Sequence, residues 1–164
     1  MNSKLNMTKQ IIIFFLLGLF VISCSNSNKM IKGTNIPETE TNKAIVTLLN
    51  KYNKALETMN VDTLLSIASK DYYDNAGTTD SKDDFGYSQL KEILEDRFKS
   101  IREIHQKMYI NSIIDDNEHY VVNYNYKGRF LMEVNSKTLW IEKEDKNEIV
   151  IIKVDNEYKI LKGM

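Results

Sequence analysis

The sequence predicts an α+β domain made of three N-terminal helices followed by a curved antiparallel sheet. Two observations support this fold class. Apolar residues recur with the 3.6-residue period of a helix up to Ile101, and with the two-residue period of a strand beyond it. The predicted helices all precede the main strands, which is typical of α+β domains rather than of alternating βαβ folds.

The first predicted helix starts at Thr41. Its apolar residues are adjacent or three to four positions apart, so they share one helix face. These residues are Ile45, Leu48, Leu49, Tyr52, Leu56 and Met59. Asn60 is placed to cap a second, short helix with the sequence VDTLLSIASK, because its side chain can accept a hydrogen bond from a free amide at a helix start.

A polar segment, DYYDNAGTTDSKDDFG, follows the second helix. Its Asp, Asn, Gly and Ser residues predict short extended pieces around a turn near Ala76 and Gly77. Ser88 is the predicted cap of a third helix. The apolar stripe of that helix is Leu90, Ile93, Leu94, Phe98 and Ile101.

The clearest strand runs from Tyr120 to Val134, where one face is apolar throughout and the other mostly polar. At about 3.3 Å per residue it would span roughly 50 Å, so it must bend, and Gly128 marks the expected bulge or kink. We expect four other strands, KMYINSII, KTLWIEKE, NEIVIIKV and EYKIL, with turns at DDNE and VDNE.

The N-terminus has the three parts of a secretory signal peptide. Lys4 and Lys9 precede the apolar run IIIFFLLGLFVI, which ends at Ser23-Cys24. The run is shorter than the ~20 residues that a membrane-spanning helix needs. Cys24 is the only cysteine, so it cannot form an intramolecular disulfide.

Residues 21–24, VISC, resemble the lipobox of bacterial lipoproteins. The resemblance implies signal cleavage between Ser23 and Cys24, and lipid attachment to Cys24. Two or three acyl chains make a stable anchor. Residue 25 is a serine, whereas an inner-membrane retention signal has an aspartate at this position. In a cell with two membranes, we therefore expect the protein to be anchored in the outer membrane and to face the periplasm.

Residues 24–40 are polar and contain the only proline, so they predict a flexible tether, and residues 41–164 are the size of one domain. Removing residues 1–23 leaves 20 basic and 23 acidic residues, a net charge of −3. No basic patch is evident, so nucleic-acid binding is not expected.

Residues 41–164 resemble the nuclear-transport-factor-2-like superfamily, which includes SnoaL-like proteins and ketosteroid isomerase. The resemblance depends on YNKALETMNVDTLL, SKDYYDNAG, SQLKEIL and the closing DNEYKIL. It implies a cone, in which a curled sheet wraps around helices and leaves a pocket at the wide end.

Ketosteroid isomerase uses a tyrosine and a neutral carboxylic acid as oxyanion donors and another aspartate as the base. Its tyrosine position matches Tyr52. Its base position falls on Ala76, with Asp74 the nearest acid, and its neutral-acid position falls in KTLWIEKE, where no inward carboxylate is expected. Tyr52 also fits the apolar stripe of its helix, so a structural tyrosine is the favoured interpretation.

The predicted pocket-lining residues are Tyr52, Asp74, Tyr120, Tyr124 and Tyr126. The three strand tyrosines could instead be sheet core, although each buried hydroxyl then needs a partner. Asp71, Asp74, Asp80, Asp83 and Asp84 do not have the spacing of a calcium loop, and His105 and His119 are not clustered. We therefore expect no metal, cofactor or catalytic residue.

The favoured function is a non-catalytic envelope lipoprotein whose exported domain binds a small amphipathic ligand or an envelope protein. Two alternatives stay open: an isomerase- or dehydratase-like enzyme that uses acid–base chemistry in the cone, and a structural envelope module. An enzyme needs two titratable groups that converge in the pocket, whereas a binder needs only an apolar cavity with one or two polar groups. A homodimer is also compatible with the sequence.

Overall fold

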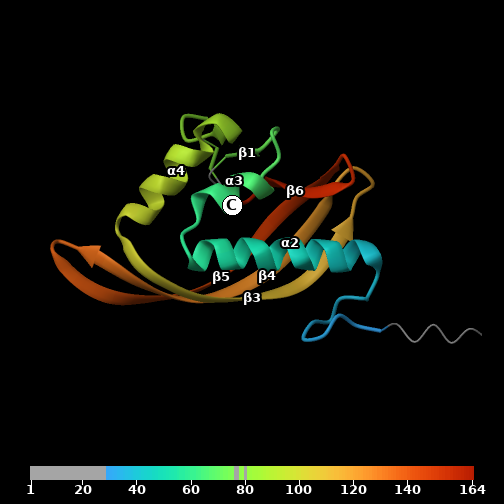
Figure 1. Cartoon of the computed structure of the whole chain (residues 1–164), viewed down its shortest axis with the longest axis horizontal. Helices are drawn as coiled ribbons and strands as arrows, with labels where there is room; N and C mark the ends of the chain where they lie inside the picture. Colours follow the sequence, from blue (N-terminus) through green and yellow to red (C-terminus); the bar gives the residue numbers. More distant parts are fainter. Residues whose placement is uncertain (1–28, 76–77, 80) are drawn as a thin grey trace, which may run out of the picture.

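The computed structural model describes residues 29–75, 78–79 and 81–164. Helices α2 (Glu40–Glu57), α3 (Val61–Ile67) and α4 (Tyr87–Lys99) lie on the concave side of a curved sheet (Figure 1). The sheet has the order β3 (Ile101–Asp115), β4 (Tyr120–Val134), β5 (Lys137–Val154) and β6 (Glu157–Lys162), and every neighbouring pair is antiparallel. The predicted α+β class is confirmed.

Two helix starts follow the expected capping chemistry. The Thr39 hydroxyl accepts a hydrogen bond from the Asn42 amide at 3.0 Å, so α2 starts one residue before the predicted Thr41. The Asn60 side chain accepts from the Thr63 amide at 2.8 Å, which confirms the predicted cap of α3. This helix ends at Ile67, before the predicted Lys70, because Ala68 turns extended and bridges to β6.

The predicted cap of the third helix is wrong. Helix α4 begins at Tyr87, directly after the short strand pair β1 (Tyr73–Asp74) and β2 (Phe85–Gly86), and Gly86 takes the cap position in place of Ser88. The Gln89 side chain accepts a hydrogen bond from the Gly86 amide at 2.9 Å. Strand β2 passes straight into the helix, so the helix starts earlier than the side-chain pattern suggests.

Strand β4 matches the predicted strand at both ends, whereas the two strands expected after it are one. KTLWIEKE and NEIVIIKV form the single 18-residue strand β5. Asp145 and Lys146, between the two segments, pair in register with Tyr126 and Asn125 of β4. Because β4 is continuous, β5 keeps its backbone hydrogen bonds to β4 through this exposed polar stretch.

The strand bends as predicted (Figure 1), but it has no bulge at Gly128. Gly128 pairs regularly with Gln106 and Lys143, and the register shifts lie in β3, at Ile101/Glu103 and Ile110/Ser112. Gly128 is tightly covered instead, because an added Cβ would lie 2.9 Å from the Phe130 ring.

The hydrophobic core lies under the part of the sheet that the helices cover. Strand β5 shows the boundary, since residues 137–148 are exposed while Ile149 and Ile151 are fully buried. The far end of the β4–β5 hairpin extends past the helices (Figure 1).

Strand β5 also has an open edge. Strand β6 pairs with β5 only over Val150–Val154. Within the part of the chain that the structure describes, the sheet order places no strand beside that edge over residues 137–149.

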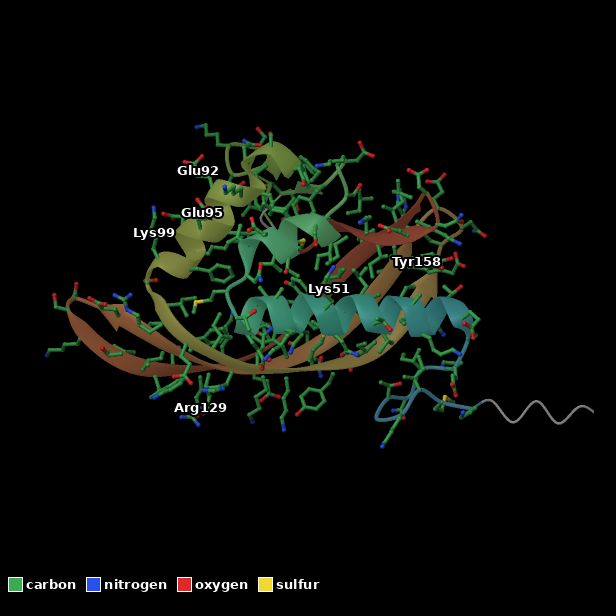
Figure 2. All side chains as sticks on the ribbon, in the orientation of Figure 1. Lys51, Glu92, Glu95, Lys99, Arg129 and Tyr158 are labelled. Atoms are coloured by element: carbon green, nitrogen blue, oxygen red, sulfur yellow. The ribbon has the colours of Figure 1, made fainter. Side chains whose placement is uncertain are left out.

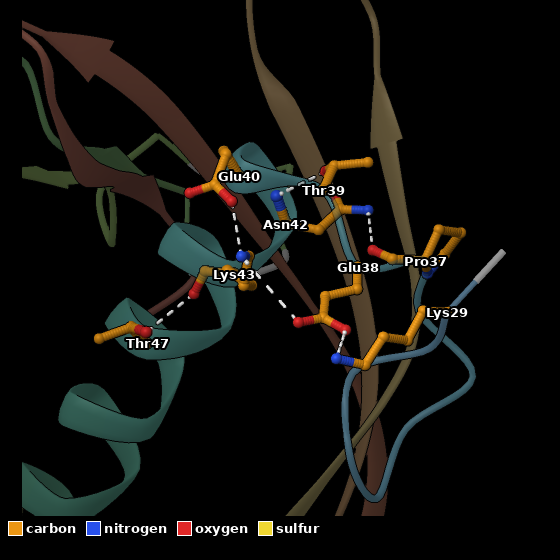
Figure 3. Close-up of polar contacts among 8 residues, drawn as sticks. All are labelled: Lys29, Pro37, Glu38, Thr39, Glu40, Asn42, Lys43 and Thr47. Atoms are coloured by element: carbon orange, nitrogen blue, oxygen red, sulfur yellow. Dashed lines mark hydrogen bonds and ion pairs between the residues drawn. The ribbon is translucent and has the colours of Figure 1, made fainter. Parts of the chain in front are cut away.

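The N-terminal described segment is a closed loop (Figure 3). Met30 and Pro37 form an antiparallel bridge, Ile36 is only 3% exposed, and the Glu38 amide donates to the Lys29 carbonyl at 2.6 Å. Glu38 also forms an ion pair with Lys29 at 3.1 Å. The segment predicted as a flexible tether, residues 24–40, is therefore hydrogen-bonded from Lys29 onward.

Candidate ligand cavity

The concave face of the sheet holds a cavity of about 440 Å³ between α2, α4 and the strands. Its size falls within the range of small-molecule sites, roughly 300–1,000 Å³. Most of its lining is apolar: Leu56, Phe98, Ile101, Ile104, Met108, Phe130, Met132, Ile141 and Met164. The polar lining is Tyr52, Gln106, Tyr124, Tyr126 and Asn147, and the charged lining is Arg97 and Lys143.

The polar part of the wall is built around Tyr52 and Tyr124. Both are buried, and the Asn147 amide donates to the Tyr124 oxygen at 3.5 Å. Burial raises the pKa of the Tyr52 phenol well above its usual value, and raises the pKa of Tyr124 as well. Both phenols therefore stay protonated near neutral pH and can donate hydrogen bonds but not act as bases.

Two cations reach the cavity from different layers. Arg97, on α4, donates from Nη1 to a main-chain oxygen of Met164 at 2.9 Å. Lys143, on β5, is 3.4 Å from a carboxylate oxygen of Asp145, and a hydrogen bond to Tyr126 raises the pKa of its ammonium group. Neither residue was singled out by the sequence patterns.

Three of the five predicted pocket residues, Tyr52, Tyr124 and Tyr126, lie on the cavity wall. Asp74 does not. Its carboxylate accepts from the Tyr72 hydroxyl at 3.0 Å and from the Gly163 amide at 3.1 Å. The Met164 amide in turn donates to the Tyr72 oxygen at 3.1 Å. Asp74 therefore fastens residues 163–164 to β1.

Tyr120 is also absent from the cavity wall. Its ring packs edge-on against Tyr158, with the ring centres 5.6 Å apart. The Tyr158 hydroxyl is 3.4 Å from the Thr41 oxygen, at the start of α2. Figure 2 shows Tyr158 at the end of the molecule opposite the junction of α4 and β3. The position of Tyr120 on the apolar face was predicted, but its distance from the cavity was not.

Of the three ketosteroid isomerase positions matched in the sequence, only the tyrosine position, Tyr52, holds the same residue type and lines the cavity. Ala76, at the base position, lies outside the described residues, as do Ser23 and Cys24. Within Lys137–Glu144 the register places Leu139, Ile141 and Lys143 on the concave face, so a cation occupies the region where an acid donor would stand.

A second, larger hollow of about 640 Å³ lies mainly on the convex side of the sheet. Its charges are largely paired across strands: Lys127 with Glu144 at 3.4 Å, and Arg129 with Glu142 at 3.6 Å. Figure 2 shows Arg129 pointing away from the helices. Paired surface charges bind weakly and are screened by salt, so the concave cavity is the better ligand site despite its smaller volume.

The histidines are separate. The exposed His105 ring stacks on Trp140 at 5.7 Å, on the convex side, and His119 lies 3.8 Å from Asp116 in the β3–β4 turn. Among the described residues, no group of three or more His, Cys, Asp or Glu side chains could hold a metal ion. Within the same residues, no helix is both long and apolar enough to cross a membrane.

No family model matches the sequence, and no curated protein matches it. Solved structures do resemble it. A ketosteroid isomerase-like protein from Erwinia carotovora atroseptica superposes with a TM-score of 0.64 at 11% identity, covering 77% of this chain and 95% of that one. A conserved protein from Planctomyces limnophilus gives 0.63 at 13% identity, covering 75% and 92%.

A nuclear transport factor 2-like superfamily protein from Salmonella enterica serovar Typhimurium also superposes, with a TM-score of 0.60 at 14% identity, covering 74% of this chain and 86% of that one. At these identities the likeness concerns the fold. Helices inside a curved antiparallel sheet, a concave cavity and these superpositions agree: the chain has the nuclear-transport-factor-2-like fold.

Proposed function

We propose that the domain binds a small amphipathic ligand in the concave cavity and does not catalyse a reaction. The observation that supports this proposal most directly is the composition of the cavity wall. Its apolar side chains can shelter a hydrocarbon group, while Tyr52, Tyr124 and Asn147 provide a compact polar patch. An apolar pocket with a few convergent polar groups is the usual form of a small-molecule site.

The absence of a base argues against the enzymatic alternative. Proton abstraction near neutral pH requires a carboxylate, a histidine or a lysine with a lowered pKa within reach of the substrate. The described cavity wall contains no Asp, Glu or His. Tyr52, Tyr124 and Lys143 have raised pKa values, so they hold their protons.

One feature favours the enzymatic alternative. Tyr52 and Tyr124 are both buried and both line the cavity, and phenol hydroxyls in such a position can stabilise an oxyanion. A solved structure of the same fold is ketosteroid isomerase-like. The alternative predicts turnover of enolisable ketones, which a pure binder does not show.

We also propose that the protein is anchored to the bacterial envelope by lipid on Cys24. Residues 1–24 lie outside the described structure. The support for this proposal is therefore their sequence alone. The closed loop beginning at Lys29 adds a consequence. Four residues, 25–28, separate Cys24 from that loop, and at most ~3.6 Å per residue they reach less than about 20 Å. The domain would therefore stay close to the membrane surface.

Photoaffinity labelling tests the binding function on the anchored protein. The full chain is reconstituted in phosphatidylcholine nanodiscs and illuminated with a neutral decyl diazirine, and adducts are mapped by mass spectrometry. We expect saturable labelling of peptides that contain Met108, Phe130 and Met132. Met132→Trp, which fills the cavity, should abolish it, whereas Leu131→Trp on the opposite face should not. Labelling that is diffuse, or equal in both variants, contradicts the proposal.

A further inference from the structure

One face of the β4–β5 hairpin carries apolar side chains that begin inside the cavity and continue outside it. Phe130 and Met132 of β4 line the cavity, and the register places Ile141 opposite Phe130 and Leu139 opposite Met132. Directly paired residues share a face, and so do alternate residues of one strand. We call these four residues and Val134, the next residue on this face of β4, the apolar track.

The apolar track becomes more exposed toward the end of the hairpin. Tyr124, on the same face of β4 at the inner part of the cavity, is buried. At the outer end, where the hairpin extends past the helices (Figure 1), Val134 and Leu139 are each 40% exposed. Adjoining exposed apolar side chains that continue a cavity wall indicate a binding surface rather than isolated surface residues.

The cavity is also exposed along β5, but that side is polar. Lys143 and Asn147 line the cavity there, and both are exposed. Lys143 is paired with Asp145 at 3.4 Å. A hydrocarbon chain that left the cavity on this side would take water away from charged groups without replacing their hydrogen bonds. The apolar track therefore gives a hydrocarbon chain the more favourable path out of the cavity.

The volume of the cavity sets the length at which a ligand has to use this path. At about 30 Å³ for each water-sized group, 440 Å³ holds roughly fifteen such groups. Decanol, with eleven non-hydrogen atoms, fits inside. Octadecanol, with nineteen, does not, so part of its chain must lie outside the cavity.

We propose that the ligand is a long-chain amphipath whose polar head lies at Tyr52 and Tyr124 and whose tail leaves the cavity along the apolar track. This inference rests on the proposed binding function. The end of the tail covers Val134 and Leu139. Since each methylene removed from water contributes to binding, the affinity rises with chain length beyond what the cavity encloses.

Two photoaffinity probes locate the head and the tail on the full chain in phosphatidylcholine nanodiscs. Both probes are octadecanol with one diazirine, placed beside the hydroxyl in the first and near the terminal methyl in the second. Adducts are assigned to residues by fragmentation in the mass spectrometer. We expect the first probe to label Tyr124 and the second to label Val134 and Leu139. Met132→Trp, which fills the cavity between these positions, should remove both sets of adducts.

Competition with the decyl diazirine measures the effect of chain length. Val134→Ser and Leu139→Ser should each weaken competition by octadecanol about three- to fivefold, because a methylene fully removed from water is worth roughly three- to fourfold in affinity. Decanol should stay within twofold, since it does not reach these residues. Val154→Ser is the matched control, because Val154 is 38% exposed and is not among the described cavity lining. Each variant is compared with the wild type for the same alcohol, so partition into the bilayer cancels.

The outcomes separate the two proposals. Adducts at Val134 and Leu139 that disappear in Met132→Trp support the inference. Adducts there that persist in Met132→Trp mean that the bilayer or another molecule contacts the hairpin end, which overturns it. Adducts confined to the cavity, with octadecanol competing equally in the wild type and the two serine variants, overturn it while the binding function stands. Failure of both octadecanol probes and of the decyl diazirine to label the cavity saturably overturns the binding function itself.

Discussion

Tyr52 allows packing and hydrogen bonding to be separated by two substitutions. Tyr52 is 4% exposed in the core, and its hydroxyl lies at the cavity wall. Tyr52→Phe should lower the free energy of unfolding by about 0.5–1.5 kcal/mol, the worth of one hydrogen bond. Tyr52→Ala should lower it by roughly 3–5 kcal/mol, because the ring leaves a cavity. Urea unfolding measures both.

The same variants bear on catalysis. We expect no turnover of enolisable ketones by the wild type. Clear turnover that falls ~10²–10³-fold in Tyr52→Phe, the usual effect of losing one oxyanion donor, at unchanged stability, would establish the enzymatic alternative instead.

The buried tyrosines make stability depend on alkaline pH. Burial raises the pKa of Tyr52 and Tyr124 in the folded state, while unfolded tyrosine ionises near pH 10. Above that pH the folded protein binds more protons than the unfolded one, so stability falls as pH rises, by up to about 1.4 kcal/mol per pH unit per phenol.

Urea unfolding between pH 8 and pH 11 checks this slope. The double variant Tyr52→Phe/Tyr124→Phe should have a shallower slope than the wild type. Tyr109→Phe, at a position that is 52% exposed, should keep the wild-type slope. If the double variant also keeps it, other groups set the alkaline limit.

At the residue scale, the sequence predicted which face of a strand a side chain occupies better than it predicted how far along the strand that side chain lies from the cavity. The alternation in β4 correctly placed Tyr124 and Tyr126 on the concave side together with Tyr120. Periodicity cannot say how far along a long strand the helices extend, so Tyr120 was assigned to the same wall. Arg97 and Lys143 were missed because isolated cations in a chain with 22 Lys and Arg give no pattern.

Among the elements, the end of β6 imposes the strictest local requirement. Gly163 has φ +91°, and an added Cβ would lie 2.3 Å from the Glu148 carbonyl oxygen of β5. Gly163→Ala should therefore cost more than the ~1–2 kcal/mol of a left-handed backbone, because two backbones must separate. Gly33, with φ +80° and nothing within 4 Å of an added Cβ, is the matched control and should show only the backbone cost.

Thermal unfolding compares the two glycine variants. Equal losses would mean that the chain at Gly163 moves away from β5 without penalty, and that the hydrogen bonds of residues 163–164 contribute little to stability.

The start of α2 offers a second comparison, in which two threonines of one helix region have opposite roles (Figure 3). Thr39 caps the helix, so Thr39→Ala should cost about 0.5–2 kcal/mol. Thr47 lies inside the helix, exposed, and its hydroxyl bonds only the Lys43 carbonyl at 2.8 Å. Thr47→Ala should be neutral or slightly stabilising, because alanine favours the helix. Chemical denaturation distinguishes these outcomes, and a loss in Thr47→Ala as large as that in Thr39→Ala would contradict the capping argument.

At the element scale, the sequence predicted those features that depend only on residues close together in the chain. The Asn60 cap, the stripe of α2 and the limits of β4 all follow from spacing within a few residues. The continuity of β5 could not be predicted, because it depends on the unbroken β4, whose paired residues are distant in sequence. The loop from Lys29 to Thr39 was missed because its composition is that of a linker, although Met30 pairs with Pro37 and Ile36 is buried.

At the scale of the whole molecule, we propose that the protein is anchored to a membrane, and a substitution of Cys24 tests this proposal. Cys24→Ala should remove the lipid, leave the uncleaved precursor and prevent stable lipid-dependent anchoring. Radiolabelled palmitate fed to expressing cells should enter the wild type and not the variant. Ser25→Ala, beside the cysteine, should still be labelled. Equal labelling of wild type and Cys24→Ala would contradict lipidation at this residue.

The open edge of β5 has a consequence for crowding. An unpaired strand edge is a template on which another polypeptide can add, and such edges lead to aggregation when they are long and apolar. Along residues 142–147, the open edge of β5 carries ionisable side chains at Glu142, Lys143, Glu144, Asp145 and Lys146, whereas the neighbouring Leu139, Trp140 and Ile141 are exposed and apolar. Pairing two such edges would strip water from many charges at once. Lipid-anchored copies would meet at high local density in the plane of a bilayer, and this charged stretch would disfavour edge-to-edge pairing between them there.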